Sequence, residues 1–199
     1  MPVKEAKALL KSGATHEKCL AASELMKAQP EKALKIVSNS LKSDDKIFRN
    51  SVLSNATKTL GPTALLPLLN ARFKKLSSDA KVDVLNWFGN NKISTVTNHI
   101  IIPSFEEGGD VAKAAIAAAG KIGGNNYLVK SLLGQLGGEN GLDALTALKS
   151  FKGNINEDVA AALDEKLAAG DKPAVRKLLD LASSRRMSNV APTVFSMIN

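Results

Sequence analysis

The chain has 199 residues, enough for one or two domains with a sizeable core. Aromatic residues make up only 4% of it while Leu and Ala dominate, which favours helices over sheets. No apolar run approaches the roughly 18–20 residues that cross a bilayer, and a single cysteine excludes an intrachain disulfide. The net charge of +8 lies in residues 1–75, with 14 Lys or Arg against 6 Asp or Glu.

Apolar periodicity and turn residues predict short helices along the whole chain. We expect a helix over 3–11, then pairs over 15–28 and 30–41, 44–60 and 64–75, 78–89 and 93–102, 110–122 and 127–136, 142–151 and 157–169, and a sixth pair opening at 171 whose second helix starts near 190. Pro67 predicts that its helix begins late or bends. Ser43 and Asp44 are expected to cap the helix that follows them.

Two of these segments leave questions open. The run ISTVTNHIII over 93–102 is β-branched and could form a strand, but its place among helices favours a helix that Pro103 kinks or ends. The last helix includes Val194, Phe195, Met197 and Ile198 and carries no polar cap. We expect it either to pack back on its neighbour or to cover another domain or subunit.

The helical pairs recur with a period near 32 residues. One apolar position per pair recurs at spacings of 33, 32, 31, 29 and 34: Leu20, Leu53, Leu85, Ile116, Leu145 and Leu179. A second residue three positions later, apolar in five of the six pairs, shares the same helix face. The stretch Val111–Ile122 is almost wholly Ala and Ile, so we expect it to lie closely between two neighbouring helices.

Two segments resemble the first helix of HEAT-like repeats: Asp110–Gly123 and Pro173–Ala182. Each begins with Asp or Pro, followed within three places by a basic residue. The resemblance implies an all-α armadillo-type fold, a right-handed α-α superhelix (α-solenoid) of about six helical hairpins in one domain over residues 1–199. The tetratricopeptide period of about 34 is also close, but its Trp-Leu-Gly-Tyr pattern is not found in any pair.

In HEAT-like families the second helix of each pair lines the concave face. Carried over to this chain, that face grades from basic through uncharged polar to acidic. The candidate partner-binding residues on it are Lys32, Lys35, Arg72, Lys74, Lys75, Asn98, His99, Tyr127, Glu157 and Asp158.

No constellation of residues points to catalysis. His16 and Cys19 are three apart on one helix face, which would suit a nucleophile, but the favoured interpretation is a small apolar Cys beside a capping residue. The set of Cys and His residues is too small for a zinc site, and the Gly-rich GKIGGNN lacks phosphate-loop spacing. We therefore expect no enzyme activity, no metal and no cofactor.

The leading functional hypothesis is a non-catalytic scaffold that binds a protein, or another domain of its own chain, through the second helices. One alternative is nucleic-acid binding through the basic first third. Another is an accessory helical domain of a larger bacterial carbohydrate-active enzyme. No membrane partner is expected. If the chain is complete, the absence of a signal segment in Met1–Glu5 predicts a cytoplasmic protein; if it is a fragment, the compartment stays open.

Overall fold

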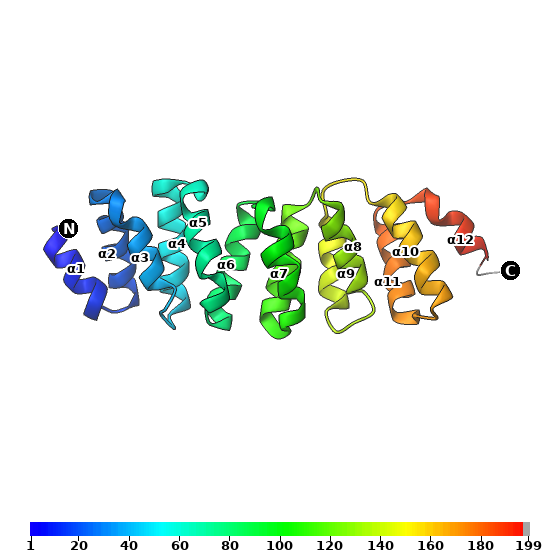
Figure 1. Cartoon of the computed structure of the whole chain (residues 1–199), viewed down its shortest axis with the longest axis horizontal. Coiled ribbons are helices and arrows are strands. Elements are labelled where there is room, and N and C mark those ends of the chain that lie inside the picture. The colour runs from blue at the N-terminus through cyan, green and yellow to red at the C-terminus, as the bar shows by residue number, and fades with distance from the viewer. Residues whose placement is uncertain (197–199) are drawn as a thin grey trace. The chain divides into compact units, whose positions relative to one another are not determined.

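A computed structural model describes residues 1–196, and within that range the chain is all-helical, without a strand (Figure 1). The all-α prediction is therefore confirmed. The elements are α1 (Val3–Ser12), α2 (Thr15–Ala28), η1 (Pro30–Lys32), α3 (Ala33–Ser40), α4 (Lys46–Leu60), α5 (Pro62–Arg72), η2 (Phe73–Lys75), α6 (Ser78–Asn90), η3 (Ser94–Val96), η4 (Thr97–Ile101), η5 (Pro103–Glu107), α7 (Gly109–Ile122), α8 (Asn126–Gly134), α9 (Gly141–Ser150), α10 (Asn156–Ala168), α11 (Lys172–Ser184), η6 (Ser188–Val190) and α12 (Ala191–Ser196).

The chain divides into two compact units, Met1–Trp87 and Phe88–Asn199, and the division falls within α6. In unit 1, α2 packs on α1 and on α4, while α3 contacts α4 and α5 (Figure 1). The first helices of successive pairs therefore touch each other, and so do the second helices. The buried side chains between them are mainly small or aliphatic, including Ala22, Val52 and Leu65.

The same pattern holds inside unit 2. Helix α9 lies against α7 and α11, while α10 contacts α8 and α12. Eight residues of α7 are buried, among them Ala115, Ile116 and Gly120. The apolar stretch Val111–Ile122 thus forms a buried helix, as its composition predicts.

Leu20 is wrong as the inner position of the first pair, because its side chain is 59% exposed. Ala22 and Leu25 are buried instead, with the same spacing as Leu53 and Ala56 in α4. Two positions turn an α-helix by about 200°, so Leu20 faces away from the core. With Ala22 as the first position, the spacing to Leu53 becomes 31 residues.

The β-branched run 93–102 is helical, as the prediction favoured, but not as one α-helix. A 3-10 turn, η3, leads into the π-helical segment η4, and a second 3-10 helix starts at Pro103. The crowded χ1 angles of successive β-branched residues disfavour a regular α-helix here.

Three local predictions need correction or fall outside the structure. Helix α5 starts at Pro62 with Pro67 inside it, so the predicted late start is wrong. The cap of α4 is Asp45, whose carboxylate accepts the N–H of Phe48 at 3.0 Å, one residue later than predicted. The predictions for Met197 and Ile198 concern positions outside the residues that the structure describes.

Candidate binding groove

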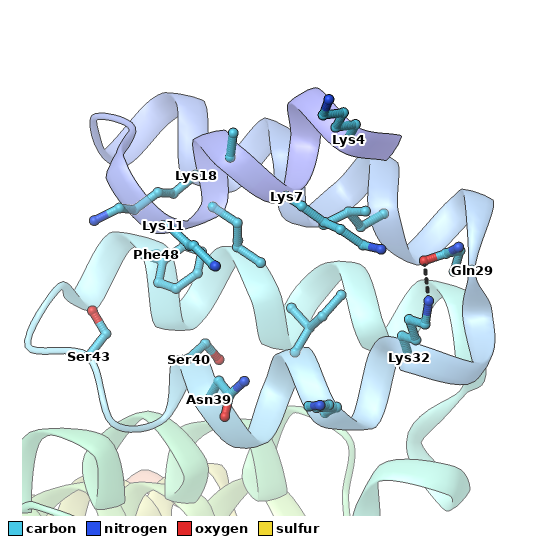
Figure 2. A pocket seen from close by; sticks show the side chains of 15 residues that line it. Lys4, Lys7, Lys11, Lys18, Gln29, Lys32, Asn39, Ser40, Ser43 and Phe48 are labelled. Carbon is cyan, nitrogen blue, oxygen red and sulfur yellow. Dashed lines mark hydrogen bonds between the residues drawn. The ribbon is translucent and has the colours of Figure 1, made fainter. Parts of the chain in front are cut away.

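A groove of about 970 Å³ lies in unit 1, where α1, α2, α3 and the start of α4 meet (Figure 2). We call it the lysine groove. It is lined by Lys4, Lys7, Ala8, Leu10, Lys11, Lys18, Leu25, Gln29, Lys32, Lys35, Ile36, Asn39, Ser40, Ser43 and Phe48.

One wall of the lysine groove is α1. Lys4, Lys7 and Lys11 are three and four residues apart, so they share one face of this helix. Ala6 is buried and fixes the rotation of α1, which packs on α2. Figure 2 shows Lys7 and Lys11 extending from α1 toward the helices opposite.

The opposite wall is formed by η1 and α3. Lys32 and Lys35 are exposed and three residues apart. The Nζ of Lys32 donates a hydrogen bond of 2.7 Å to the Oε1 of Gln29, another residue of the lining (Figure 2). Pro30 starts η1 with a fixed φ and so sets the direction of this wall.

The charge of the lysine groove is of one sign. Six of its lining residues are lysines and none is Asp or Glu. Within residues 1–196, no carboxylate forms an ion pair with Lys4, Lys7, Lys11 or Lys35. A concave surface lined by one sign of charge concentrates the field and raises the local concentration of ions of the opposite sign.

The carboxylate of Asp45, which interacts with Lys18, already accepts hydrogen bonds from other groups. The hydroxyl of Thr15 and the backbone N–H of Phe48 donate to it and hold its pKa below the ordinary value. The charge of Lys18 lowers the same pKa to a smaller extent. Asp45 therefore serves mainly to cap the start of α4.

The floor of the lysine groove is apolar. Leu25, Ile36 and Phe48 line it and are at most 8% exposed, and Leu10 of α1 is half-buried beside them. These side chains belong to the core of unit 1, so the floor is held in place by packing. The groove thus combines a cationic rim with an apolar base.

The structure brings only Lys32 and Lys35 of the predicted partner-binding residues into this groove. Arg72 ends α5, and Lys74 and Lys75 lie in η2; all three are exposed and none lines the groove. The lysines of α1 and α2 went unpredicted because the resemblance placed binding on second helices. Their signal was present in the sequence as the 4, 7, 11 spacing of lysines on one amphipathic helix.

The remaining predicted residues lie in unit 2 and are separate from this groove. Asn98 and His99 are exposed in η4, and Tyr127 is 68% exposed in the first turn of α8. Glu157 and Asp158 occupy the first turn of α10, where negative charge stabilises the helix N-terminus. None of these five lines the lysine groove.

A second group of lysines borders a cavity of about 330 Å³ in unit 2. It contains Lys92, Lys121 and Lys152, close to the C-terminal ends of α6, α7 and α9. Lys121 donates a 2.8 Å hydrogen bond to Asn90. Helix C-terminal ends carry partial negative charge, so these lysines stabilise the helices that they follow or end.

Neither the histidines nor the cysteine line the lysine groove or the second cavity. His16 is exposed and Cys19 half-buried on α2. Residues 1–196 hold no group of three or more side chains that could ligate a metal ion. Over the same residues, every helix is too short or too polar to cross a membrane.

Comparisons with models of protein families, with curated proteins and with solved structures give no match.

Proposed function

We propose that this chain is a non-catalytic α-helical repeat module that binds an anionic partner in the lysine groove. The observation that carries the proposal is the groove itself: six lysines line one concavity that has no acidic residue. A surface that serves only solubility mixes charges of both signs. Lysines gathered in a concavity repel one another, and a bound anion relieves that repulsion.

The repeat part of the proposal is a HEAT-like solenoid, and it rests on packing inside each unit. First helices contact first helices, as α2 does α4 and α9 does α11. Polar contacts between these helices also recur at similar sequence separations: 34 residues for Arg49 with Asp83, 31 for Lys121 with Asn90 and 31 for Lys149 with Asp180. Such recurrence is typical of repeat arrays in which each repeat packs on its neighbour.

The scaffold hypothesis placed binding on second helices along the whole chain, whereas the proposed site lies in unit 1. Lys32 and Lys35 stay as binding residues, and the lysines of α1 join them. Binding through Arg72, Glu157 and the other predicted residues of the second helices stays a prediction. So does a role as an accessory domain of an enzyme, since no described contact bears on it.

The experiment compares two triple variants of equal charge. Lys7→Gln, Lys11→Gln and Lys35→Gln remove three of the six lysine charges of the groove, whereas Lys58→Gln, Lys74→Gln and Lys75→Gln remove three exposed lysine charges elsewhere in unit 1. The probe is a fluorescein-labelled heparin fragment followed by anisotropy at low and physiological salt. The groove variant is expected to bind at least tenfold more weakly, and the control within about twofold of the wild type.

Two results would count against the proposal. Equal loss in both variants would mean that overall charge, not the groove, attracts the anion. No binding by the wild-type chain at low salt would remove the anionic partner altogether. Circular dichroism of each variant shows whether the fold is retained.

A further inference from the structure

We infer that the partner of the lysine groove is an acidic amphipathic segment of another protein, seated as a helix with its carboxylates on the lysines and its apolar side chains on the floor. This inference rests on the proposed function and names the chemistry of the partner. It draws on two properties of the same groove, its cationic rim and its apolar base, which a purely ionic ligand would not use together.

The size of the groove favours a polypeptide segment over a single small anion. Its volume of about 970 Å³ lies at the upper end of the range of roughly 300–1,000 Å³ typical of ligand pockets. A phosphate or sulfate ion would leave the apolar part of the lining uncovered, in which Ala8 is exposed and Leu10 is half-buried. A segment with several side chains can fill the volume and cover the floor.

The spacing of the lysines matches a helix. Lys4, Lys7 and Lys11 span seven residues, or roughly 10 Å along α1 at about 1.5 Å per residue. A partner helix with acidic residues at i, i+3 or i+4, and i+7 presents carboxylates over the same length. Apolar residues beside that acidic row would face the floor, as in other complexes in which an amphipathic helix lies in a groove.

Nucleic acid fits the same groove less well. Phosphate and base recognition favour the planar guanidinium of Arg, and every cation of the lining is Lys. Single-stranded nucleic acid also needs exposed aromatic rings for stacking, and Phe48, the aromatic residue of the lining, is only 8% exposed. The rim could hold phosphates, but the floor would contribute little to their binding.

The test uses designed ligands on the full chain. The first is a labelled helical peptide with Glu at i, i+4 and i+7 and Leu along the adjoining stripe. The second has the same composition in an order that mixes the two faces, and the third is an oligothymidylate of equal net charge. Affinities are measured by fluorescence anisotropy at two salt concentrations.

One substitution changes the shape of the groove without changing its charge. Ala8 is exposed, lines the groove and lies on α1, so Ala8→Leu fills the groove while every lysine and core side chain is kept. Ala14→Leu, at an exposed position outside the lining, is the matched control. The segregated peptide is expected to bind at least tenfold more tightly than the mixed one. Ala8→Leu should reduce that affinity at least tenfold, and Ala14→Leu less than twofold.

The outcomes separate this inference from the function on which it rests. Oligothymidylate or mixed peptide binding as tightly as the segregated peptide, with no effect of Ala8→Leu, would overturn the amphipathic partner and leave anion binding standing. If the segregated peptide binds the Ala8→Leu variant as tightly as the wild type, its binding site lies outside the groove, and the inference is also overturned. Failure of all three ligands and of heparin at low salt would overturn both proposals together.

Discussion

A buried ion pair between α4 and α6 gives the sharpest test of how unit 1 is held together. Arg49 and Asp83 are each 1% exposed, and the Arg49 Nε donates to the Asp83 carboxylate at 2.6 Å. Arg49 also donates to the carbonyl of Ser43 at 2.7 Å, and the side chain of Asn50 donates to Asp83 at 2.8 Å. The pair therefore joins two helices and the loop that precedes the first of them.

Removing one partner should be costly because the other charge stays buried. Asp83→Leu is expected to lower the free energy of unfolding by about 3–5 kcal/mol. The double variant Arg49→Met with Asp83→Leu replaces both charges by apolar side chains and should lie within about 1–2 kcal/mol of the wild type. The Nη2 of Arg49 has no hydrogen-bond acceptor among the described residues, so the wild-type pair itself is incompletely satisfied.

The assay is urea unfolding followed by the fluorescence of Trp87. This residue is the single tryptophan of the chain, and its indole N–H donates to Thr57 at 2.7 Å across the same two helices. The wild type, both single variants and the double variant complete a mutant cycle that isolates the coupling between the two charges.

An exposed pair of similar sequence separation serves as the control. Lys149 and Asp180 join α9 and α11 at 2.9 Å, with side chains 36% and 52% exposed. Asp180→Leu, followed by circular dichroism, should cost less than about 1 kcal/mol. The reasoning would be refuted if Asp83→Leu cost no more than this control, or if the double variant were less stable than both single variants.

Two further predictions concern a close helix contact and a cap. Gly120→Ala should lower the free energy of unfolding by about 1–3 kcal/mol, because a Cβ there would lie 2.9 Å from the Cβ of Ala147; Gly134→Ala, with no atom within 4 Å, should be neutral or stabilising in the same urea titration. Asp45 has a pKa below its ordinary 3.8, so its contribution is present above pH 3.8 and lost as pH falls through the lower folded value. The destabilisation by Asp45→Asn seen in thermal melts at pH 7 should therefore shrink below pH 3.8, and a pH-independent difference would contradict it.

Local structure could be predicted well because it depends on neighbours in sequence. The buried helix predicted over 111–122 is α7, Gly109–Ile122, since a run of Ala and Ile flanked by Gly has few alternatives. Leu20 misled the alignment because an exposed Leu is common and periodicity alone does not show which face a weakly amphipathic helix buries. The buried alanines next to Leu20 show which face of α2 packs in the core.

The lysine groove could not be predicted in the same way, because it depends on how α1 packs. Lys7 and Lys35 are 28 residues apart in sequence and meet around one cavity because α1 packs on α2 rather than over α3. The sequence held the excess charge and the lysine spacing but no signal for that packing. The Arg49–Asp83 pair could not be predicted either, because its partners are 34 residues apart and meet only through helix packing.

One repeated position explains how the first helices approach each other in both units. After the anchors Leu53, Leu85 and Ile116, the residue four places later contacts the residue two places after the next anchor. The contacts that follow this rule are Thr57 with Trp87 in unit 1, and Gly89 with Ala118 and Gly120 with Ala147 in unit 2. Side-chain size at this position therefore bears directly on the distance between successive first helices.

The two units use this position differently. In unit 1 the hydroxyl of Thr57 meets the indole of Trp87 there, and a 2.7 Å hydrogen bond joins them. In unit 2 this position is glycine at Gly89 and Gly120, and a Cβ at Gly89 would lie only 2.8 Å from the Cα of Ala118. Close contact through small residues leaves little room to adjust, because a backbone cannot yield as a side chain can.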